Sequence, residues 1–265
     1  MTGLDALLPE EIARKAEDVG IAKAGRDALT LFTLAVLAGA FIALGAMLST
    51  LTAIGIGDAL PFGLARLAIG ATFSLGLILV VICGAELFTG DVLMTIAWAS
   101  RRLGAAALLR VWAIVLAGNF VGGVGTALLV FLSGHLDLHH GAAAATALAI
   151  AEHKAGLGAM EAFWRGVMCN VLVCLAVWGA LAARSVTDRI LVVVPPVTAF
   201  VAAGFEHSIA NFYFLGIGWL LDAGRIGNPL FLLAGQVPVI AGNLAGGACL
   251  VALVYWIAYL RPRRT

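Results

Sequence analysis

The sequence predicts an all-α membrane protein with six transmembrane helices in two inverted three-helix repeats. Of its 265 residues, 62% are hydrophobic and only 12% are charged, whereas soluble domains average about 25% charged residues. Six apolar stretches are long enough to cross a bilayer. Two of them are broken by similar polar clusters, around Glu86 in the first half and Glu206 in the second. Such matching breaks in two halves are typical of transporters built from inverted repeats.

The N-terminal segment, residues 1–28, is predicted to lie outside the spans. It is rich in charged residues, unlike a signal peptide. Ile12, Ala16 and Val19 recur at helical spacing. We expect an amphipathic helix over Pro9–Asp27 on the membrane surface, either as a solvated leader or as a gate.

The channel domain is expected to cover residues 29–260. Its predicted spans are 29–54, 62–85 with a continuation over 92–99, 104–133, 160–183, 190–205 with a continuation over 209–221, and 230–260. The first repeat is about 29–134 and the second about 160–260. An outer connecting loop over about 135–159 joins them, and residues 261–265 form a tail.

Basic residues predict that both termini face the cytoplasm. With the N-terminus inside, twelve Lys and Arg residues lie on the cytoplasmic side, and only Arg66, Lys154, Arg165 and Arg225 lie outside. Each half has three spans, so the second half enters the membrane in the opposite direction. The two breaks are therefore expected to meet near mid-membrane, with a pore between them.

Each break is predicted to aim the N-terminus of a half-helix at the pore, after Thr89-Gly90 in one half and around His207-Ser208 in the other. Free amides and a partial positive charge at these ends favour a small anion. The Thr89 hydroxyl and a His207 ring nitrogen can each donate a hydrogen bond. Because His207 is the only histidine in a span, we favour a functional role over a structural one.

Four further polar residues are interpreted as supports. For Glu86 and Glu206 the alternatives are a proton relay or a carboxylate that accepts hydrogen bonds from the unwound backbone or the other repeat, and we favour the second. Asn119 and Asn243 each stand just before a Gly-Gly pair. We expect them to brace closely packed helices.

Other classes of function are disfavoured. The net charge of +1 provides no basic face for nucleic acid. The four cysteines lie in apolar segments without the spacing of a zinc site, and the histidines near His139 lack a convincing ligand set. We expect no cofactor and no metal. The order Glu206-His207 does not match a His-Glu-x-x-His protease, so we do not expect an enzyme.

The chain resembles the formate/nitrite transporter family from about Ala28 to Leu260. Four motifs carry the resemblance: Phe73-Ser74-Leu75-Gly76-Leu77-Ile78-Leu79, Gly84-Ala85-Glu86-Leu87-Phe88-Thr89, Cys169-Asn170-Val171-Leu172-Val173-Cys174-Leu175-Ala176-Val177-Trp178, and Gly204-Phe205-Glu206-His207-Ser208-Ile209-Ala210-Asn211. The resemblance implies an aquaporin-like fold, a homopentamer with one pore in each subunit, and the cytoplasmic (inner) membrane of a bacterium. Asp91 departs from the family pattern, so the resemblance does not predict how gating depends on pH.

The resemblance also implies roles for individual residues. Phe73 and Leu77 would form the cytoplasmic constriction, and Phe200 with Leu87 the outer one. Thr89 would lie in a mobile loop facing His207. The remaining implied positions are a pore-lining Asn170, a vestibule lysine at Lys154 that attracts anions and influences the central histidine, and a supporting Asn211.

The resulting hypothesis is a bidirectional formate channel or transporter that is linked to protons through His207. Formate would cross either as neutral formic acid after proton donation or as an anion hydrogen-bonded to His207. Nitrite is the nearest alternative substrate, and hydrosulfide is a weaker one. An aquaporin-like channel for neutral solutes is disfavoured because neither break contains Asn-Pro-Ala.

Overall fold

The computed structural model describes residues 6–262, and in this part of the chain every regular element is a helix. The elements are α1 (Pro9–Ala24), α2 (Ala28–Ala53), α3 (Ile56–Ala59), α4 (Phe62–Phe73), α5 (Leu75–Cys83), α6 (Phe88–Asp91), η1 (Val92–Met94), α7 (Thr95–Ala99), α8 (Ala105–Leu132), η2 (His135–Asp137), α9 (Ala142–Ala155), α10 (Ala159–Ala182), α11 (Val186–Ala202), α12 (Ser208–Leu221), α13 (Ala223–Ile226), α14 (Pro229–Ala245), η3 (Gly246–Ala252), α15 (Leu253–Tyr255) and η4 (Trp256–Leu260). Residues 1–5 and 263–265, the ends of the expected leader and tail, lie outside the described part.

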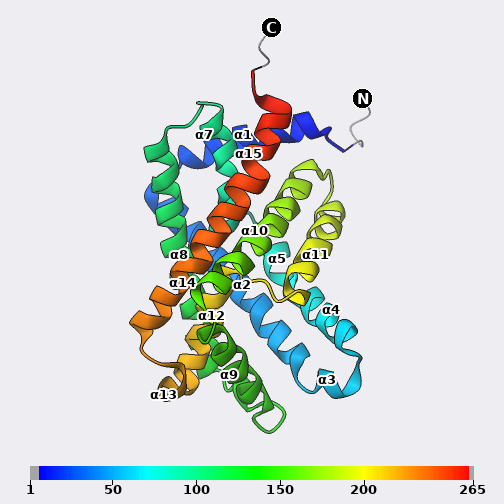
Figure 1. Ribbon diagram of the computed structural model, residues 1–265, viewed down its shortest axis with the longest axis vertical. Coiled ribbons are helices and arrows are strands. Elements are labelled where there is room, and N and C mark those ends of the chain that lie inside the picture. The colour runs from blue at the N-terminus through cyan, green and yellow to red at the C-terminus, as the bar shows by residue number, and fades with distance from the viewer. Residues whose placement is uncertain (1–5, 263–265) are drawn as a thin grey trace.

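The helices run between two ends of the molecule (Figure 1). One end, here the terminal end, holds α1, α7 and both ends of the described part of the chain; the other, the α9 end, holds α3, α9 and α13. Within the described residues, five helical stretches have the length and apolarity of membrane spans: 28–53, 62–83, 105–132, 159–182 and 232–260. The expected fifth span consists of α11 and α12, which are 17 and 14 residues long.

Two helix pairs hold the bundle together through glycines. A Cβ atom on Gly39 of α2 would collide with the backbone of Asn119 in α8, and one on Gly242 of α14 would collide with the Phe163 carbonyl of α10. Small residues matter here because lipid supplies no hydrophobic drive for helix association, so that close packing must. The same kind of pair therefore stands in each half of the chain.

The breaks fall where the sequence predicts them, but three boundaries differ. The connecting segment is not a loop, because residues 142–155 form α9. Helix α1 ends at Ala24, and Asp27 instead caps α2 by accepting a hydrogen bond from the Thr30 amide at 3.0 Å. The first half-helix begins at Phe88, before Thr89 rather than after Gly90. Each difference reflects capping or helix propensity of residues that apolarity alone does not register.

Candidate functional site

Each break begins with a glycine in the left-handed region, Gly84 and Gly204, both with φ of 75°. Only glycine adopts this conformation readily, so it ends the preceding helix and redirects the chain. The unwound segments then run to Leu87 and His207, which occupy the N-cap positions of α6 and α12. Leu87 is thus the counterpart of His207 in the first half.

Two asparagines hold the unwound backbone in the same way in both halves. The Asn119 amide donates to the carbonyls of Ala35 and Glu86 at 2.7 and 2.9 Å, and its oxygen accepts from the Phe88 amide at 2.9 Å. Asn243 repeats this pattern in the second half. Because an unpaired peptide group is costly away from water, these bonds make an unwound segment tolerable at membrane depth.

Asn243 donates to the carbonyls of Gly166 and Glu206 at 2.8 and 3.0 Å and accepts from the Ser208 amide at 3.0 Å. Both asparagine side chains are completely buried. The geometry is that of the brace expected from the sequence.

His207 and Thr89 form the contact between the two breaks. The Thr89 Oγ1 and His207 Nε2 atoms are 3.0 Å apart, and both side chains are buried. The other ring nitrogen, Nδ1, accepts a hydrogen bond from the Ala210 amide at 3.1 Å. A neutral ring that accepts at Nδ1 carries its proton on Nε2. His207 therefore donates to Thr89, which leaves the Thr89 hydroxyl proton free for a third group.

A cavity of about 350 Å³ opens from His207 toward the α9 end. Its lining includes three basic side chains, Arg66, Lys154 and Arg165, against the single carboxylate of Glu206. Two of them also hold the break: Arg66 donates to the carbonyls of Val201 and Ala202 at 2.7 and 2.9 Å, and Arg165 to that of Gly204 at 3.2 Å. The excess of positive charge suits an anion.

The two break carboxylates are neutralised from opposite ends of the molecule. Glu206 pairs with Lys154 of α9 at 2.8 Å and accepts from the Asn211 amide at 2.8 Å. The expectation that these carboxylates would bind unwound backbone or the other repeat is therefore wrong. A carboxylate at this depth needs a cation more than it needs an amide.

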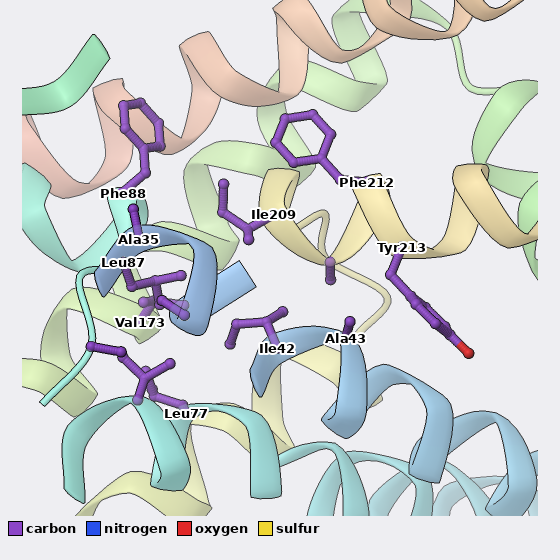
Figure 2. Close-up of a cluster of buried hydrophobic side chains, with 14 of the residues drawn as sticks. Ala35, Ile42, Ala43, Leu77, Leu87, Phe88, Val173, Ile209, Phe212 and Tyr213 are labelled. Atoms are coloured by element: carbon purple, nitrogen blue, oxygen red, sulfur yellow. The ribbon is translucent and has the colours of Figure 1, made fainter. Parts of the chain in front are cut away.

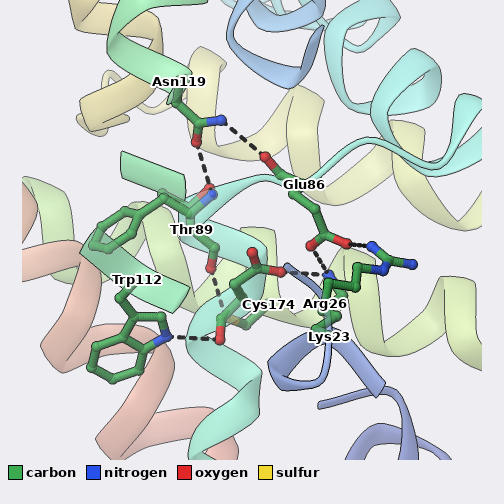
Figure 3. A network of polar contacts seen from close by, with 9 residues as sticks. Lys23, Arg26, Glu86, Thr89, Trp112, Asn119 and Cys174 are labelled. Atoms are coloured by element: carbon green, nitrogen blue, oxygen red, sulfur yellow. Dashed lines mark hydrogen bonds and ion pairs between the residues drawn. The ribbon is translucent and has the colours of Figure 1, made fainter. Parts of the chain in front are cut away.

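On the terminal side, Glu86 pairs with Lys23 at 2.6 Å and with Arg26, while Lys23 also binds Asp91 at 2.5 Å (Figure 3). Lys23 belongs to α1 and Arg26 follows it. Burial alone would lower the pKa of Lys23, but Asp91 and Glu86 outweigh burial and raise its pKa above the ordinary value of 10.5. The N-terminal helix is thus bound by charge to the first break.

The aromatic and aliphatic constriction residues are paired differently from the expectation. Phe73 faces Phe200, with ring centroids 5.7 Å apart, and both line the cavity toward the α9 end. Phe200 in turn stacks on the His207 ring at 5.8 Å. Leu77 and Leu87 are buried in the central cluster that Figure 2 draws in part, outside the cavity lining. The expected pairs, Phe73 with Leu77 and Phe200 with Leu87, are therefore wrong, because Phe73 ends α4 on the cavity side and meets Phe200 there, whereas Leu77 belongs to α5.

Asn170 is buried but does not line the cavity. Its amide donates to the Asn243 carbonyl at 2.6 Å, and its Oδ1 has no hydrogen-bond partner among residues 6–262. Asn170 therefore supports the brace residue from α10. Its contact with a pore stays a prediction.

The sequence analysis missed Lys23, Arg26, Arg66 and Arg165 as parts of the site. The signal was present for the first two, since they stand three residues apart in a helical leader that precedes a chain with two buried carboxylates. Nothing in the sequence indicates which carboxylates they reach. For Arg66 and Arg165 the sequence indicated only a position near the outer ends of the spans 62–85 and 160–183.

Comparison with known proteins agrees with this geometry. The sequence profile of the formate/nitrite transporter family matches residues 10–257. The chain is 39% identical to the formate channel FocA of Escherichia coli strain K12, over 97% of this chain and 96% of the relative. It is 36% identical to the formate channel FocA of Haemophilus influenzae, over 94% and 93%.

A solved structure described as a pentameric formate channel with formate bound matches 88% of this chain and 98% of its own, with a TM-score of 0.79 and 37% identity. Family, motifs and architecture therefore agree over nearly the whole length. The chain belongs to the formate/nitrite transporter family.

Proposed function

We propose that this chain is a bidirectional, proton-linked formate channel or transporter of a bacterial inner membrane, with both termini in the cytoplasm. The observation that carries the proposal is the His207–Thr89 pair at the base of a basic cavity. Similarity to channels named for formate supports this anion over nitrite. The solved pentamer supports a homopentamer with one pore in each subunit.

The anion is attracted by Arg66, Lys154 and Arg165 and then passes the apolar Phe73–Phe200 pair. The apolar constriction formed by these two side chains opposes the passage of a bare anion because the anion loses its hydration there. Beyond this constriction, the hydroxyl of Thr89 donates a hydrogen bond to the carboxylate of formate, and the hydrogen bond from His207 to Thr89 strengthens that donation. The N-terminal amides of α6 and α12 add positive potential at the same point.

Proton transfer places a further demand on His207. Its Nε2 proton can leave only after Nδ1 has taken up another proton, because the alternative is an imidazolate anion. In this structure His207 Nδ1 accepts a hydrogen bond from the Ala210 amide. Protonation of Nδ1 would remove this bond and leave two N–H donors facing each other. The proton-linked cycle that we propose therefore couples charging of His207 to loosening of the first turn of α12.

The test replaces His207 by asparagine. Asparagine is a favoured N-cap residue, so H207N keeps the start of α12 while removing the titratable ring. Proteoliposomes of H207N are expected to lose formate import driven by a pH gradient. Unchanged gradient-driven import in H207N would contradict the proton relay. A second pair of variants, T89V and T89S, tests the hydroxyl donor separately from the His207 ring, because T89V removes the hydroxyl and T89S keeps it.

Substrate preference is measured with the unmodified protein. Uptake of labelled formate is expected to be competed most strongly by unlabelled formate, and less by nitrite, acetate or hydrosulfide, across a pH series. Stronger competition by nitrite than by formate would reassign the substrate within the same family.

A further inference from the structure

We propose that a groove at the terminal end binds the phosphate headgroup of an anionic phospholipid. The groove has a volume of about 700 Å³ and lies between α1, the turn after α7, and η4 with the two residues that follow it. It is separate from the cavity at His207, and nothing in the transport mechanism uses it. Its lining combines arginines with two large aromatic side chains.

The charge of the groove is one-sided. Arg101 and Arg261 are exposed, and neither side chain forms an ion pair or a hydrogen bond within residues 6–262. The one carboxylate in the lining, Glu17, is already paired with Arg102 at 3.1 Å. A phosphodiester, with one negative charge and several acceptor oxygens, matches the fixed donors of two arginines.

The backbone at Arg101 gives an independent reason for a ligand. Its φ is 59°, in the left-handed region. The amides of Arg101 and Arg102 bond to the carbonyls of Trp98 and Ala97 at 2.9 and 3.0 Å, the helix-ending pattern in which glycine normally takes this position. An arginine here costs stability that glycine would save. The presence of arginine instead of glycine at this position is explained if the guanidinium of Arg101 binds a ligand such as the lipid phosphate.

The position along the membrane selects a lipid over a soluble phosphate. Arg101 follows the apolar helix that ends at Ala99, and Arg261 follows the span that ends at Leu260. Both therefore lie at the level of the headgroups. Trp256 and Tyr259 flank them, and Trp256 is fixed by a hydrogen bond to Ser100 at 3.0 Å. Tryptophan and tyrosine favour this level because one edge is apolar and the other polar.

Occupation of the groove would join three parts of the chain. A lipid phosphate held by Arg101 and Arg261 lies against α1, which supplies Arg14 and Glu17 to the same lining. The ligand would thereby tie the N-terminal helix to the ends of two spans. Anionic lipid is therefore expected to stabilise the full chain, not only to bind it.

The test uses the purified full-length protein and native mass spectrometry with phosphatidylglycerol or phosphatidylcholine. Phosphatidylglycerol is expected to stay bound and to raise the melting temperature, and phosphatidylcholine is not. The double variant R101N/R261Q keeps a residue suited to positive φ at 101 and should weaken phosphatidylglycerol binding about tenfold or more. R189Q, which removes an arginine at the same end outside the groove, is the matched control.

Three results would overturn the proposal. One is phosphatidylglycerol binding unchanged by R101N/R261Q. Another is an equal loss in R189Q, which would indicate general attraction to the surface. The third arm uses inorganic phosphate and glycerol phosphate without acyl chains; an arginine-dependent shift as large as that of the lipid would assign the groove to a soluble anion.

Discussion

At the scale of single residues, the two halves share their supports and differ in their donors. Asn119 and Asn243 make the same pattern of three hydrogen bonds, two to the break and one to a neighbouring helix. At the N-cap positions of α6 and α12, however, the first half has Leu87 where the second half has His207. Chemistry at the centre therefore comes from the place where the repeats differ, while the identical residues maintain the backbone that presents it.

We expect Asn243→Leu to destabilise the protein by about 1–3 kcal/mol for each buried group that it leaves unpaired. The Ser208 amide and the carbonyls of Gly166 and Glu206 each lose the hydrogen bond that they form with the Asn243 side chain. Thermal unfolding in detergent measures the effect. Thr52→Ala, which removes a bond only to Leu48 in its own helix, is the control, and an equal effect of the two changes would contradict the bracing role.

At the scale of elements, short helices outside the spans complete the site. Helix α9 brings Lys154 to Glu206, and α1 brings Lys23 to Glu86 and Asp91. Each carboxylate is thus neutralised by a segment that has no span of its own. Asp91, which departs from the family pattern, has a structural role here because it gives Lys23 a second buried carboxylate partner.

We expect Lys23→Met to release α1 from the first break. Removing one partner of a buried ion pair costs about 3–5 kcal/mol, because the remaining charge stays buried. Hydrogen exchange of the α1 amides should rise. The double variant K23M/D91N leaves Glu86 with Arg26 and should restore part of the protection; no restoration would contradict charge as the cause.

The pH dependence of this contact follows from the direction of the Lys23 shift. A raised pKa means that the contribution of Lys23 is fully present below its ordinary value of 10.5 and is lost only as pH rises through the higher folded value. Protection of α1 that depends on the charge of Lys23 should thus not decline as pH rises from about 5 to about 9. A decline with rising pH inside this window would contradict the assignment.

At the scale of the whole molecule, every side chain of the proposed pathway comes from one chain. His207, Thr89 and the cavity residues belong to a single bundle. An assembly of five such chains should therefore contain five pores that work independently, rather than one pore on the shared axis.

Mixed assemblies test this arrangement. When H207N subunits are co-expressed with unmodified ones, proton-driven uptake should fall in proportion to the H207N fraction. A shared pore would lose uptake much more steeply, since one altered subunit would affect the whole assembly. Native mass spectrometry should show complexes of five 27.3 kDa chains, and a monomer that retains full uptake would contradict the need for assembly.

The sequence by itself determined the spans, the two breaks and the central residues. Apolar length and the glycines at 84 and 204 are local properties, because a span needs about 20 apolar residues and a left-handed turn needs glycine. His207 was identified because a titratable ring in an apolar stretch is costly unless it serves a purpose.

Tertiary structure decided which side chains meet. The pairing of Phe73 with Phe200, of Lys154 with Glu206, and of Lys23 with Glu86 joins segments far apart in the chain. Periodicity does not report such contacts, because side-chain partners depend on how helices cross and on which end of the molecule each helix starts. The segment 142–155 was expected to be a loop because apolarity does not register helix propensity, and only the fold shows that this helix brings Lys154 to Glu206.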